Sequence, residues 1–504
     1  MYKIDIKTRV VSYTKLTMHT TSIGNHGYSV LKEELTSTEI TKIRRDLTVK
    51  PFTNTNYGNE APAFPVYSES KRKLYLPRFY GIKEFGPPKS VKIDPGEDAP
   101  MNFTGKLKDK QLPIVKAFQD ATEDRETGGG IISVPCGYGK TVLALYLAAQ
   151  MGKKTLVIVH KEFLMNQWKE RIEQFLPDVK VGKIQRNVIN RDDCEIVIGL
   201  LQSISMIEYP DETFAGFGLV IYDECHHLGA EVFSRALMKT NTPFTLGLSA
   251  TPNRQDGLTK VFCWYLGDII FKITKREQET VDVMLYRYFH ESPEYSKELC
   301  NVMQKPNLPL MINNICSFMP RVNLIVTLVM DCVLEGRKIL LLSDRKNHLG
   351  ILKEEFEKYR KFHTDFPVEY TVGYYLGGMK QEELEKTEKD TIILGTFAMA
   401  SEGFDCREPL DTIVLASPKS NIEQAVGRIL RQEARDRKFT PLVIDIIDEF
   451  SMFPKQGLKR IKFYQRNKYD MRTFDSNGKE LETPKKTKKP KVAAQDLEFL
   501  ADSD

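Results

Sequence analysis

The feature that most constrains the fold is an apolar run, a glycine-rich loop and an amphipathic helix that follow one another directly at residues 128–149, GGGIISVPCGYGKTVLALYLAA. Ile131 to Val134 predicts a buried strand, Pro135 to Gly139 a loop, and Thr141 onward a helix. Such a loop binds phosphate, because its glycines let backbone N–H groups approach the oxygens and Lys140 adds a positive charge. The predicted nucleotide-binding residues of this segment are Pro135, Cys136, Gly137, Tyr138, Gly139, Lys140 and Thr141, and the Thr141 hydroxyl is also a predicted Mg²⁺ ligand.

Short apolar strands alternate with helical stretches through most of the chain, which is typical of parallel sheets covered by helices on both faces. The predicted strands are 130–134, 155–159, 194–198, 219–222 and 244–248, and then 338–342, 371–375, 391–394, 412–416 and 442–446. A chain of 504 residues is too long for one ordinary core. The predicted fold class is therefore α/β, with two tandem doubly wound parallel-sheet domains and a small N-terminal α+β accessory domain.

The predicted organisation has five parts. They are the accessory domain at 1–98, with DNA binding as a candidate role, the first parallel-sheet domain at 99–285, a connection at 286–320, the second parallel-sheet domain at 321–466, and an extension with a charged tail at 467–504. Within the first part, Thr36 and Glu39 form a capping box that predicts a helix at 37–46. The proline-rich segment 87–100 predicts a linker, and the lysine-rich tail predicts disorder with a possible short docking motif.

Composition excludes several classes of protein. The chain is 41% hydrophobic and 28% charged, so ordinary burial drives its folding. Its eight cysteines are scattered without a CxxC pair, which argues against a zinc site or a disulfide framework and for a reducing compartment. Because the sequence has neither a signal peptide nor a long apolar run, we expect an intracellular, soluble protein without a membrane partner. A net charge of +5 does not by itself indicate a nucleic-acid partner.

An acidic pair follows an apolar strand in the sequence GLVIYDECHH, residues 218–227. Asp223 and Glu224 are predicted to stand at the carboxyl end of this strand, where a doubly wound sheet presents side chains to a ligand. Asp223 can hold Mg²⁺ through water, and Glu224 can polarise an attacking water. His226 and His227 are adjacent to Cys225, but three consecutive residues cannot point at one ion, so coupling and packing roles are favoured over a metal site.

Arginines with a fixed spacing occur in the second predicted domain, in the sequence NIEQAVGRILRQ, residues 421–432. Gln424, Arg428 and Arg431 follow a QxxGRxxR pattern on a predicted helix. Two arginines three residues apart lie on one helical face and can together approach a γ-phosphate. We therefore predict that this segment supplies the cations that stabilise phosphoryl transfer.

Taken in order, these residues resemble the motif set of the superfamily 2 helicases, and the resemblance covers Leu107 to Arg466. DECH at 223–226 and RQDG at 254–257 are similar to the XPB-like branch of that superfamily. The phrases at 34–52 and 67–81 resemble helicases encoded by large nucleocytoplasmic DNA viruses. The resemblance implies two RecA-like domains that hydrolyse ATP with Mg²⁺.

The resemblance also implies roles for residues that no single pattern would reveal. It implies adenine recognition by Gln111 and nucleotide contacts by Gly403 and Asp405. It implies coupling of hydrolysis to movement by His226, Ser249, Ala250 and Thr251. It implies nucleic-acid contacts by His160, Gln167, Gln202, Ser203, Arg345, Gly377, Thr396 and Ser401.

The resulting expectation is a DNA helicase or translocase that moves 3′ to 5′ on single-stranded, duplex or branched DNA in viral replication, repair, recombination or transcription. An RNA helicase and a transcript-release factor that translocates on duplex are open alternatives. Intact Lys140, Glu224 and Arg431 argue against a binding module with a decayed motor, and the chain after Arg466 is too short for the nuclease of a restriction translocase. The expected location is the host cytoplasm, in a viral factory, or the nucleus.

Overall fold

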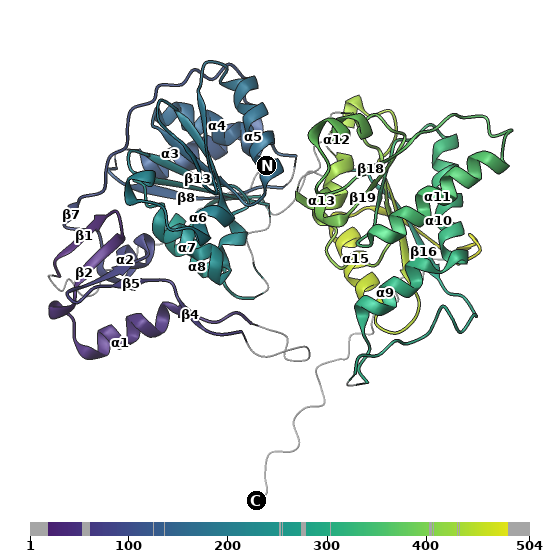
Figure 1. The fold of residues 1–504 in the computed structure, drawn as a ribbon, viewed down its shortest axis with the longest axis horizontal. Coiled ribbons are helices and arrows are strands. Elements are labelled where there is room, and N and C mark those ends of the chain that lie inside the picture. The colour runs from purple at the N-terminus through teal and green to yellow at the C-terminus, as the bar shows by residue number, and fades with distance from the viewer. Residues whose placement is uncertain are drawn as a thin grey trace, which may run out of the picture. The chain divides into compact units, whose positions relative to one another are not determined.

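The computed structural model describes residues 19–52, 61–123, 125–135, 137–250, 254, 256–273, 279–302, 304–402, 406, 408–430, 432 and 434–481, with the backbone alone at 401 and 402. The chain divides into two compact units, Met1–Arg276 and Glu277–Asp504 (Figure 1). Each unit is built on one eight-stranded sheet that is almost entirely parallel.

The sheet of the first unit has the order β11-β10-β12-β9-β13-β14-β8-β15. Its strands are β8 (Gly128–Ser133), β9 (Thr155–Val159), β10 (Val181–Gln185), β11 (Val188–Asn190), β12 (Ile196–Leu200), β13 (Leu219–Tyr222), β14 (Phe244–Ser249) and β15 (Ile269–Lys272). Only the edge strand β11 pairs antiparallel. The five strands predicted for this domain are therefore confirmed, and their continuous apolar runs reflect burial on both faces.

Helices cover both faces of this sheet (Figure 1). They are α3 (Leu112–Thr122), α4 (Lys140–Met151), α5 (Glu162–Phe175), α6 (Leu201–Met206), α7 (Glu231–Lys239) and α8 (Thr259–Leu266). Neighbouring strand residues point to opposite faces, so Ile132 packs in the core beneath α3 to α5, whereas Ile131 packs in the core with α7 and α8. The sheet thus lies between two apolar layers that fix the positions of its carboxyl ends.

The accessory domain has a sheet of its own, in the order β5-β6-β2-β1-β7. Its elements are β1 (Thr21–Gly24), β2 (Gly27–Leu31), α1 (Ser37–Asp46), β3 (Thr48–Val49), β4 (Phe64–Pro65), β5 (Ser68–Glu69), β6 (Lys73–Leu76), α2 (Arg78–Phe85) and β7 (Ser90–Val91). The capping box of Thr36 and Glu39 begins α1 as predicted. The predicted linker 87–100 instead contributes β7, because Lys89 and Lys92 donate backbone hydrogen bonds to β1.

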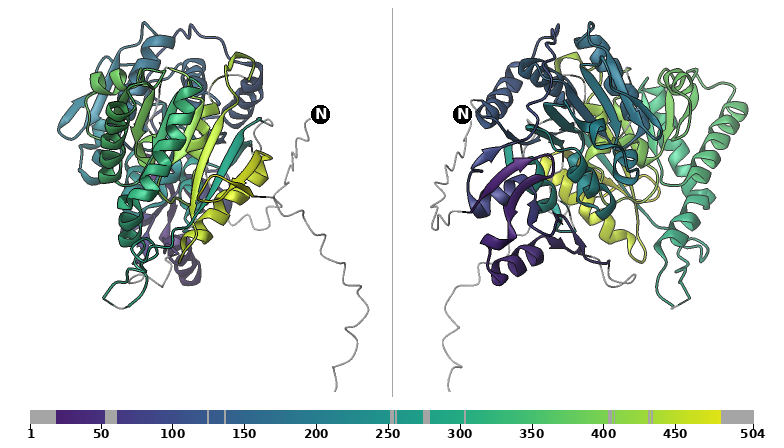
Figure 2. Two further views of the ribbon diagram at one scale, coloured as in Figure 1. Left: turned by 90° about the vertical axis from the view of Figure 1, so that its right-hand side faces the viewer. Right: turned by 60° about the vertical axis from the view of Figure 1, so that its left-hand side comes forward.

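The sheet of the second unit has the order β18-β19-β17-β20-β21-β16-β22-β23. Its strands are β16 (Asp282–Tyr288), β17 (Ile339–Leu342), β18 (Val372–Tyr375), β19 (Ile392–Gly395), β20 (Thr412–Leu415), β21 (Leu442–Asp448), β22 (Asp470–Phe474) and β23 (Glu480–Leu481). The helices are α9 (Leu308–Ser317), α10 (Met319–Leu334), α11 (Lys346–Phe362), α12 (Gln381–Thr387), α13 (Phe397–Glu402), α14 (Glu423–Val426) and α15 (Phe453–Asn467). Helices lie on both sides of this sheet (Figure 2).

Two segments outside the predicted second domain belong to its sheet. The predicted boundary at residue 285 falls inside β16, which pairs along its length with β21 and also with β22. The segment 286–320, predicted as a connection, holds α9 and the beginning of α10. The extension begins with β22, so the part of it that the structure describes is a continuation of the sheet. The lysine-rich tail lies outside the described residues.

Among the described helices, none alone is long and apolar enough to cross a membrane. Taken together, α9 and α10 have that length and composition, but the chain bends by 65° between them.

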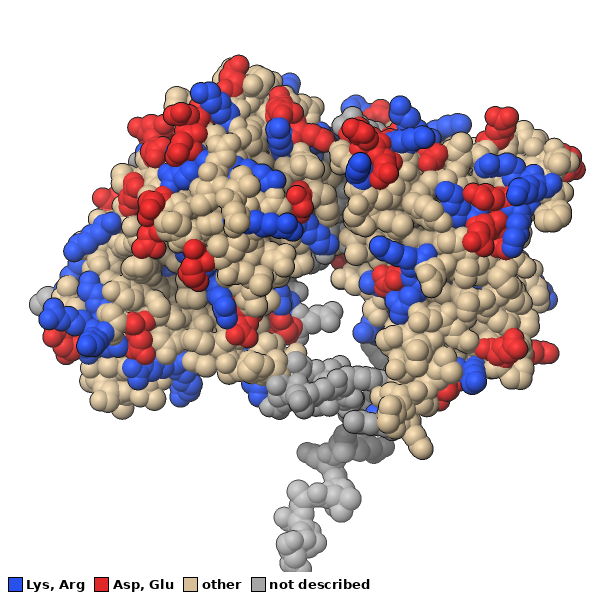
Figure 3. Space-filling view, viewed as in Figure 1, with Lys and Arg blue, Asp and Glu red and all other residues tan. Residues whose placement is uncertain are grey.

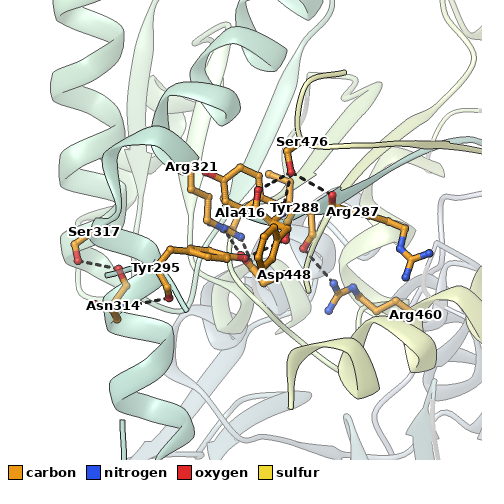
Figure 4. Close-up of polar contacts among 12 residues, drawn as sticks. Arg287, Tyr288, Tyr295, Asn314, Ser317, Arg321, Ala416, Asp448, Arg460 and Ser476 are labelled. Atoms are coloured by element: carbon orange, nitrogen blue, oxygen red, sulfur yellow. Dashed lines mark hydrogen bonds and ion pairs between the residues drawn. The ribbon is translucent and has the colours of Figure 1, made fainter. Parts of the chain in front are cut away.

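A buried polar network lies in the second unit (Figure 4). The Arg321 guanidinium donates to both carboxylate oxygens of Asp448, at 2.8 and 3.0 Å, and to the Ala416 carbonyl oxygen at 2.8 Å. The Tyr295 hydroxyl also donates to Asp448, at 2.9 Å. Arg321 and Asp448 are completely buried in this pair. The network therefore ties α10 and the segment before α9 to the carboxyl end of β21.

We expect Asp448→Ala to destabilise the second unit by about 3–5 kcal/mol, because it leaves the Arg321 charge buried without its carboxylate. Glu449→Ala is the matched control, since Glu449 pairs with the half-exposed Arg287 and should cost about 1 kcal/mol or less. The chain's two tryptophans, Trp168 and Trp264, lie in the first unit. Urea unfolding of Asp448→Ala should therefore shift the transition seen by circular dichroism and leave the tryptophan fluorescence transition in place. Equal stability of the two variants would contradict this account.

Candidate nucleotide site and nucleic-acid interface

The loop before α4 has the backbone that a phosphate site requires. Gly137 and Gly139 have φ angles of 81° and 78°, a region that L side chains rarely adopt. Nothing lies within 4 Å of the position that a Cβ would occupy on Gly137, so the space above the loop is open to a ligand. Lys140 is the first residue of α4, a helix of twelve residues, and the first turn of this helix directs free backbone N–H groups toward the loop. The residues present therefore fit a nucleotide phosphate.

Lys140 meets the acidic pair across the sheet. Its Nζ lies 3.1 Å from Oε1 of Glu224, and the two side chains are 11% and 14% exposed. Asp223 is held from the other side, because Trp168 Nε1 donates to its Oδ2 at 2.9 Å. Glu224 has a φ of 47°, an unusual conformation for a residue with a side chain. One cation and two carboxylates thus converge at the ends of β8 and β13.

The two carboxylates differ in their pKa values. Burial, and after it the charge of Glu224, raises the pKa of Asp223 above its ordinary value. Burial also raises the pKa of Glu224, but Lys140 and then His226 outweigh it, so the net shift of that pKa is downward. Glu224 is therefore the carboxylate that stays ionised most readily, which suits a group that polarises water or pairs with a cation.

His226 joins the acidic pair to the end of β14. Its Nδ1 lies 3.0 Å from the Ser249 hydroxyl and 3.4 Å from Oε2 of Glu224. Burial lowers the pKa of His226, although the charge of Glu224 opposes this shift. The His227 ring stacks on His160 with centroids 4.1 Å apart, which is a packing contact. The predicted coupling residues His226 and Ser249 are thus in direct contact, with Ala250 next in the chain.

Gln111 supports the phosphate loop through both ends of its side-chain amide. Its Nε2 donates to the Tyr138 carbonyl oxygen at 3.0 Å, and its Oε1 accepts from the Lys108 backbone N–H at 2.8 Å. The Lys110 ammonium lies 4.8 Å from the centre of the Tyr138 ring. Gln111 is 4% exposed in this arrangement, so it holds the loop, and adenine recognition stays a prediction.

The residues predicted to contact nucleic acid in the first unit follow two adjacent strands, β9 and β12. His160 comes directly after β9, and Gln167 lies on α5. Gln202 is exposed on α6, directly after β12. Ser203 differs, because it is 5% exposed and its hydroxyl accepts a hydrogen bond from the Arg186 backbone N–H at 3.0 Å. In the structure the Ser203 hydroxyl therefore fixes the turn between β10 and β11, which contains Arg186.

In the second unit, predicted contact residues follow the adjacent strands β18, β19 and β17. Gly377 is exposed in the turn after β18, and the Thr396 hydroxyl accepts from the Met399 backbone N–H at 3.4 Å, as a cap of α13. Arg345 precedes α11, where it donates to the side-chain oxygen of Asn313. Ser401 lies in α13, and its side chain is outside the described structure. Three neighbouring strand ends thus carry these positions.

The segment with the QxxGR pattern is shorter and tighter than the predicted helix. α14 ends at Val426, and Gly427–Leu430 continues as a 3-10 turn. Arg428 Nε donates to the Ala400 carbonyl oxygen, which ties this turn to α13. Gln424 is partly exposed on α14. The residues Cys136, Thr251, Gly403, Asp405 and Arg431 lie outside the described structure, so their predicted roles stay predictions.

Two residues near the site carry no prediction from the sequence. Trp168 directly follows Gln167, a predicted nucleic-acid contact, yet its indole N–H donates to Asp223. Arg254 was a marker of the XPB-like branch, yet its guanidinium donates to the His226 carbonyl oxygen. A buried tryptophan on a helix gives no sign of its polar partner, and an arginine after the Ser249 segment gives no sign of which carbonyl it meets.

Several known proteins are similar to this chain in sequence. The family model described as "Type III restriction enzyme, res subunit" matches residues 104–254. "Putative ATP-dependent RNA helicase L396" of Acanthamoeba polyphaga mimivirus is 36% identical over 466 residues, which cover 90% of this chain and 87% of that protein. "Putative ATP-dependent RNA helicase QP509L" of African swine fever virus is 26% identical and covers 66% of this chain and 67% of its own length. "Probable helicase D10" of Escherichia phage T5 is 28% identical and covers 71% and 74%.

We expect Lys140→Ala to destabilise the first unit by about 3 kcal/mol at pH 8, because two buried carboxylates lose their cation. Without Lys140 the folded-state pKa of Glu224 rises above its unfolded value, so the variant regains stability as protonation proceeds at lower pH. The loss in unfolding free energy, followed by tryptophan fluorescence in urea, should thus be larger at pH 8 than at pH 5. Lys154→Ala is the control, because its partner Glu97 is 56% exposed. We expect this variant to lose little unfolding free energy, and to lose the same amount at both pH values.

Proposed function

This chain belongs to the superfamily 2 helicases, which hydrolyse ATP and act on nucleic acid, and we propose that it is a DNA translocase that moves 3′ to 5′. Remodelling of branched or transcribing DNA in viral replication, repair, recombination or transcription is the role that this activity fits. Lys140, Asp223 and Glu224 carry ATP hydrolysis in this proposal.

One observation carries the proposal, namely the order of the strands in each sheet. In the first sheet, the order β12-β9-β13-β14-β8 separates the candidate strand-binding positions after β12 and β9 from the nucleotide positions after β13, β14 and β8. The carboxyl ends of parallel strands lie along one edge of a sheet. One edge therefore has a half for nucleic acid and a half for ATP, with His226 and Ser249 on the ATP half.

The protein's groups divide the chemistry of hydrolysis. The loop amides around Gly137 and the Lys140 ammonium would bind the phosphates, and Thr141 with Asp223 would hold Mg²⁺, which offsets the negative charge of the phosphate oxygens. Glu224 would orient the attacking water and accept its proton. Lys140 would exchange its Glu224 partner for a phosphate oxygen, which frees that carboxylate. Arg428 and Arg431 would stabilise the charge that develops on the transferred group.

The distribution of surface charge favours nucleic-acid binding through a few local phosphate contacts and argues against binding by a large basic surface. On the face shown in Figure 3, basic and acidic side chains are interspersed over both units, and no large area has one sign. The net charge is only +5. A grip on the backbone would then come from loop N–H groups, helix starts and single side chains such as Gln202 and Arg345, which recognise phosphates without reading bases.

RNA is the second candidate substrate, because the mimivirus and African swine fever virus relatives are both named as RNA helicases. The family model is named after a restriction enzyme, and the DECH and RQDG segments resemble a branch that acts on duplex DNA, and both favour DNA. A transcript-release factor that translocates on duplex DNA would share the DNA-stimulated hydrolysis of the first candidate.

ATP hydrolysis by one preparation, measured with saturating single-stranded DNA, duplex DNA, forked DNA and RNA, tests the substrate. We expect DNA to stimulate hydrolysis well above the level reached with RNA. Stimulation by RNA alone would replace DNA with RNA in the proposal. Unwinding of duplexes with a 3′ or a 5′ tail then tests direction, and a preference for the 5′ tail would reverse it.

We expect Glu224→Gln to keep ATP binding and to lose turnover, because the amide keeps the shape of the side chain but cannot accept a proton. Binding of a fluorescent ATP analogue and the steady-state rate of hydrolysis separate the two effects. General-base losses are typically about 10²- to 10⁴-fold. A variant that hydrolyses ATP at the wild-type rate would remove Glu224 from this role.

A further inference from the structure

We propose that Arg254 is a positioning residue for ATP hydrolysis, and that the accessory domain holds it in place through the backbone of Phe52. This inference rests on the proposed roles of Glu224 and His226. Arg254 contacts neither nucleotide nor nucleic acid in this proposal. It acts through the backbone of the segment that carries the acidic pair.

The contacts of Arg254 explain why it fixes that segment. Its Nη1 donates to the His226 carbonyl oxygen, and its Nε donates to Asp256, 2.9 Å from Oδ1 and 3.2 Å from Oδ2. The Arg254 and Asp256 side chains are 19% and 23% exposed, so the pair is largely shielded from water. The guanidinium also passes over Gly229, where an added Cβ would come within 2.7 Å of Nε. Arg254 thus spans the turn that follows Glu224.

This turn needs an external hold because of its geometry. Glu224 adopts a left-handed φ of 47°, and such a conformation persists only when surrounding contacts determine it. The His226 carbonyl follows two residues later, on the turn whose imidazole meets Ser249. A bond to that carbonyl limits how far the Glu224 carboxylate and the His226 ring can rotate away from the phosphate loop. A misplaced reactive group costs up to about a hundred-fold in rate.

The accessory domain reaches the same loop. The Phe52 backbone N–H donates to the Asp256 carbonyl oxygen at 3.0 Å, and a Cβ on Gly257 would meet the Phe52 ring at 2.4 Å. Asp256 is further fixed by the Leu258 N–H, 3.2 Å from Oδ1. Phe52 is 79% exposed, so burial of its ring does not explain its place against this loop. A continuous set of contacts therefore runs from the accessory domain through Asp256 and Arg254 to His226.

The rest of the accessory domain has an independent anchor. Arg78 is buried and donates to the carbonyl oxygens of Thr242 and Pro243, and the Tyr265 hydroxyl donates to the Val66 carbonyl oxygen at 2.7 Å. Loss of the single Phe52 contact should therefore leave the accessory domain attached. This separates an effect on position from an effect on folding.

Two matched pairs of variants of the full chain test the proposal. Arg254→Gln removes the guanidinium, and Gly229→Ala displaces it while its charge stays. Phe52→Pro removes the donating N–H, whereas Phe52→Ala removes the ring alone. We expect Arg254→Gln, Gly229→Ala and Phe52→Pro to lower kcat for ATP by roughly ten-fold or more, with KM for ATP within about two-fold and with each variant fully folded at the assay temperature. Phe52→Ala should stay closer to the wild type than Phe52→Pro.

Arg44→Gln is the control within the accessory domain. Arg44 pairs with Glu69 of the same domain, so we expect this variant to leave kcat as it is. Wild-type kcat in both Arg254→Gln and Phe52→Pro would overturn the proposal. A fall in kcat that tracks a fall in melting temperature across the variants would also overturn it, because the contacts would then be structural only. Lys140→Ala, assayed in parallel, reports on the proposed nucleotide site itself, so its inactivity keeps that site in place when the positioning proposal fails.

Discussion

The ion pair between Lys140 and Glu224 is the contact on which the candidate site depends. These two residues are 84 positions apart in the chain, and their ion pair joins the start of α4, after β8, to the end of β13. Neither side chain is stable alone at that depth. Lys140 keeps its charge beside a carboxylate, and the two adjacent carboxylates tolerate one another because a cation and an indole N–H neutralise or solvate them. Beside this pair, nothing lies within 4 Å of the position that a Cβ would occupy on Gly137.

The sheets could be predicted from the sequence because they are buried on both faces. Runs such as Thr155–Val159 and Ile196–Leu200 have no polar alternation to confuse them with surface strands, and all ten predicted strands are present. β16 and β22 gave no such signal. Charged residues interrupt β16, at Asp282 and Arg287, and most of β22 is exposed or partly exposed, so these segments of five to seven residues look like a connection. What makes them strands is pairing with β21 and with each other, and that pairing depends on segments about 160 and 190 residues away.

The site shows the same division between local and long-range causes. The loop geometry at Gly137 and Gly139, the capping of α1 and the place of Asp223 after a strand all follow from neighbours in the sequence. The partner of each polar group does not. Ser203 and Gln202 are adjacent and belong to the same motif, yet the first hydroxyl is taken by the Arg186 backbone and the second side chain is exposed. The packing of α6 against β10 determines which of these two side chains is buried and which is exposed. Trp168 and Arg254 escaped prediction for the same reason.

These contacts suggest where hydrolysis and movement are joined inside the first unit. His226 follows Glu224 by two residues and touches Ser249 at the end of the neighbouring strand, so under the proposed function a shift of the Glu224 carboxylate would move the histidine or break that hydrogen bond. Burial lowers the pKa of His226, and in the neutral imidazole Nδ1 can either accept from the Ser249 hydroxyl or donate to it. On the far side the same turn is fixed by Arg254, which belongs to the segment that continues from Ser249. His226 is thus held through its ring by the last residue of β14 and through its carbonyl oxygen by Arg254. Under the proposed function, a change at the nucleotide would reach Arg254 through His226, and Asp256, the partner of Arg254, accepts a hydrogen bond from Phe52 of the accessory domain.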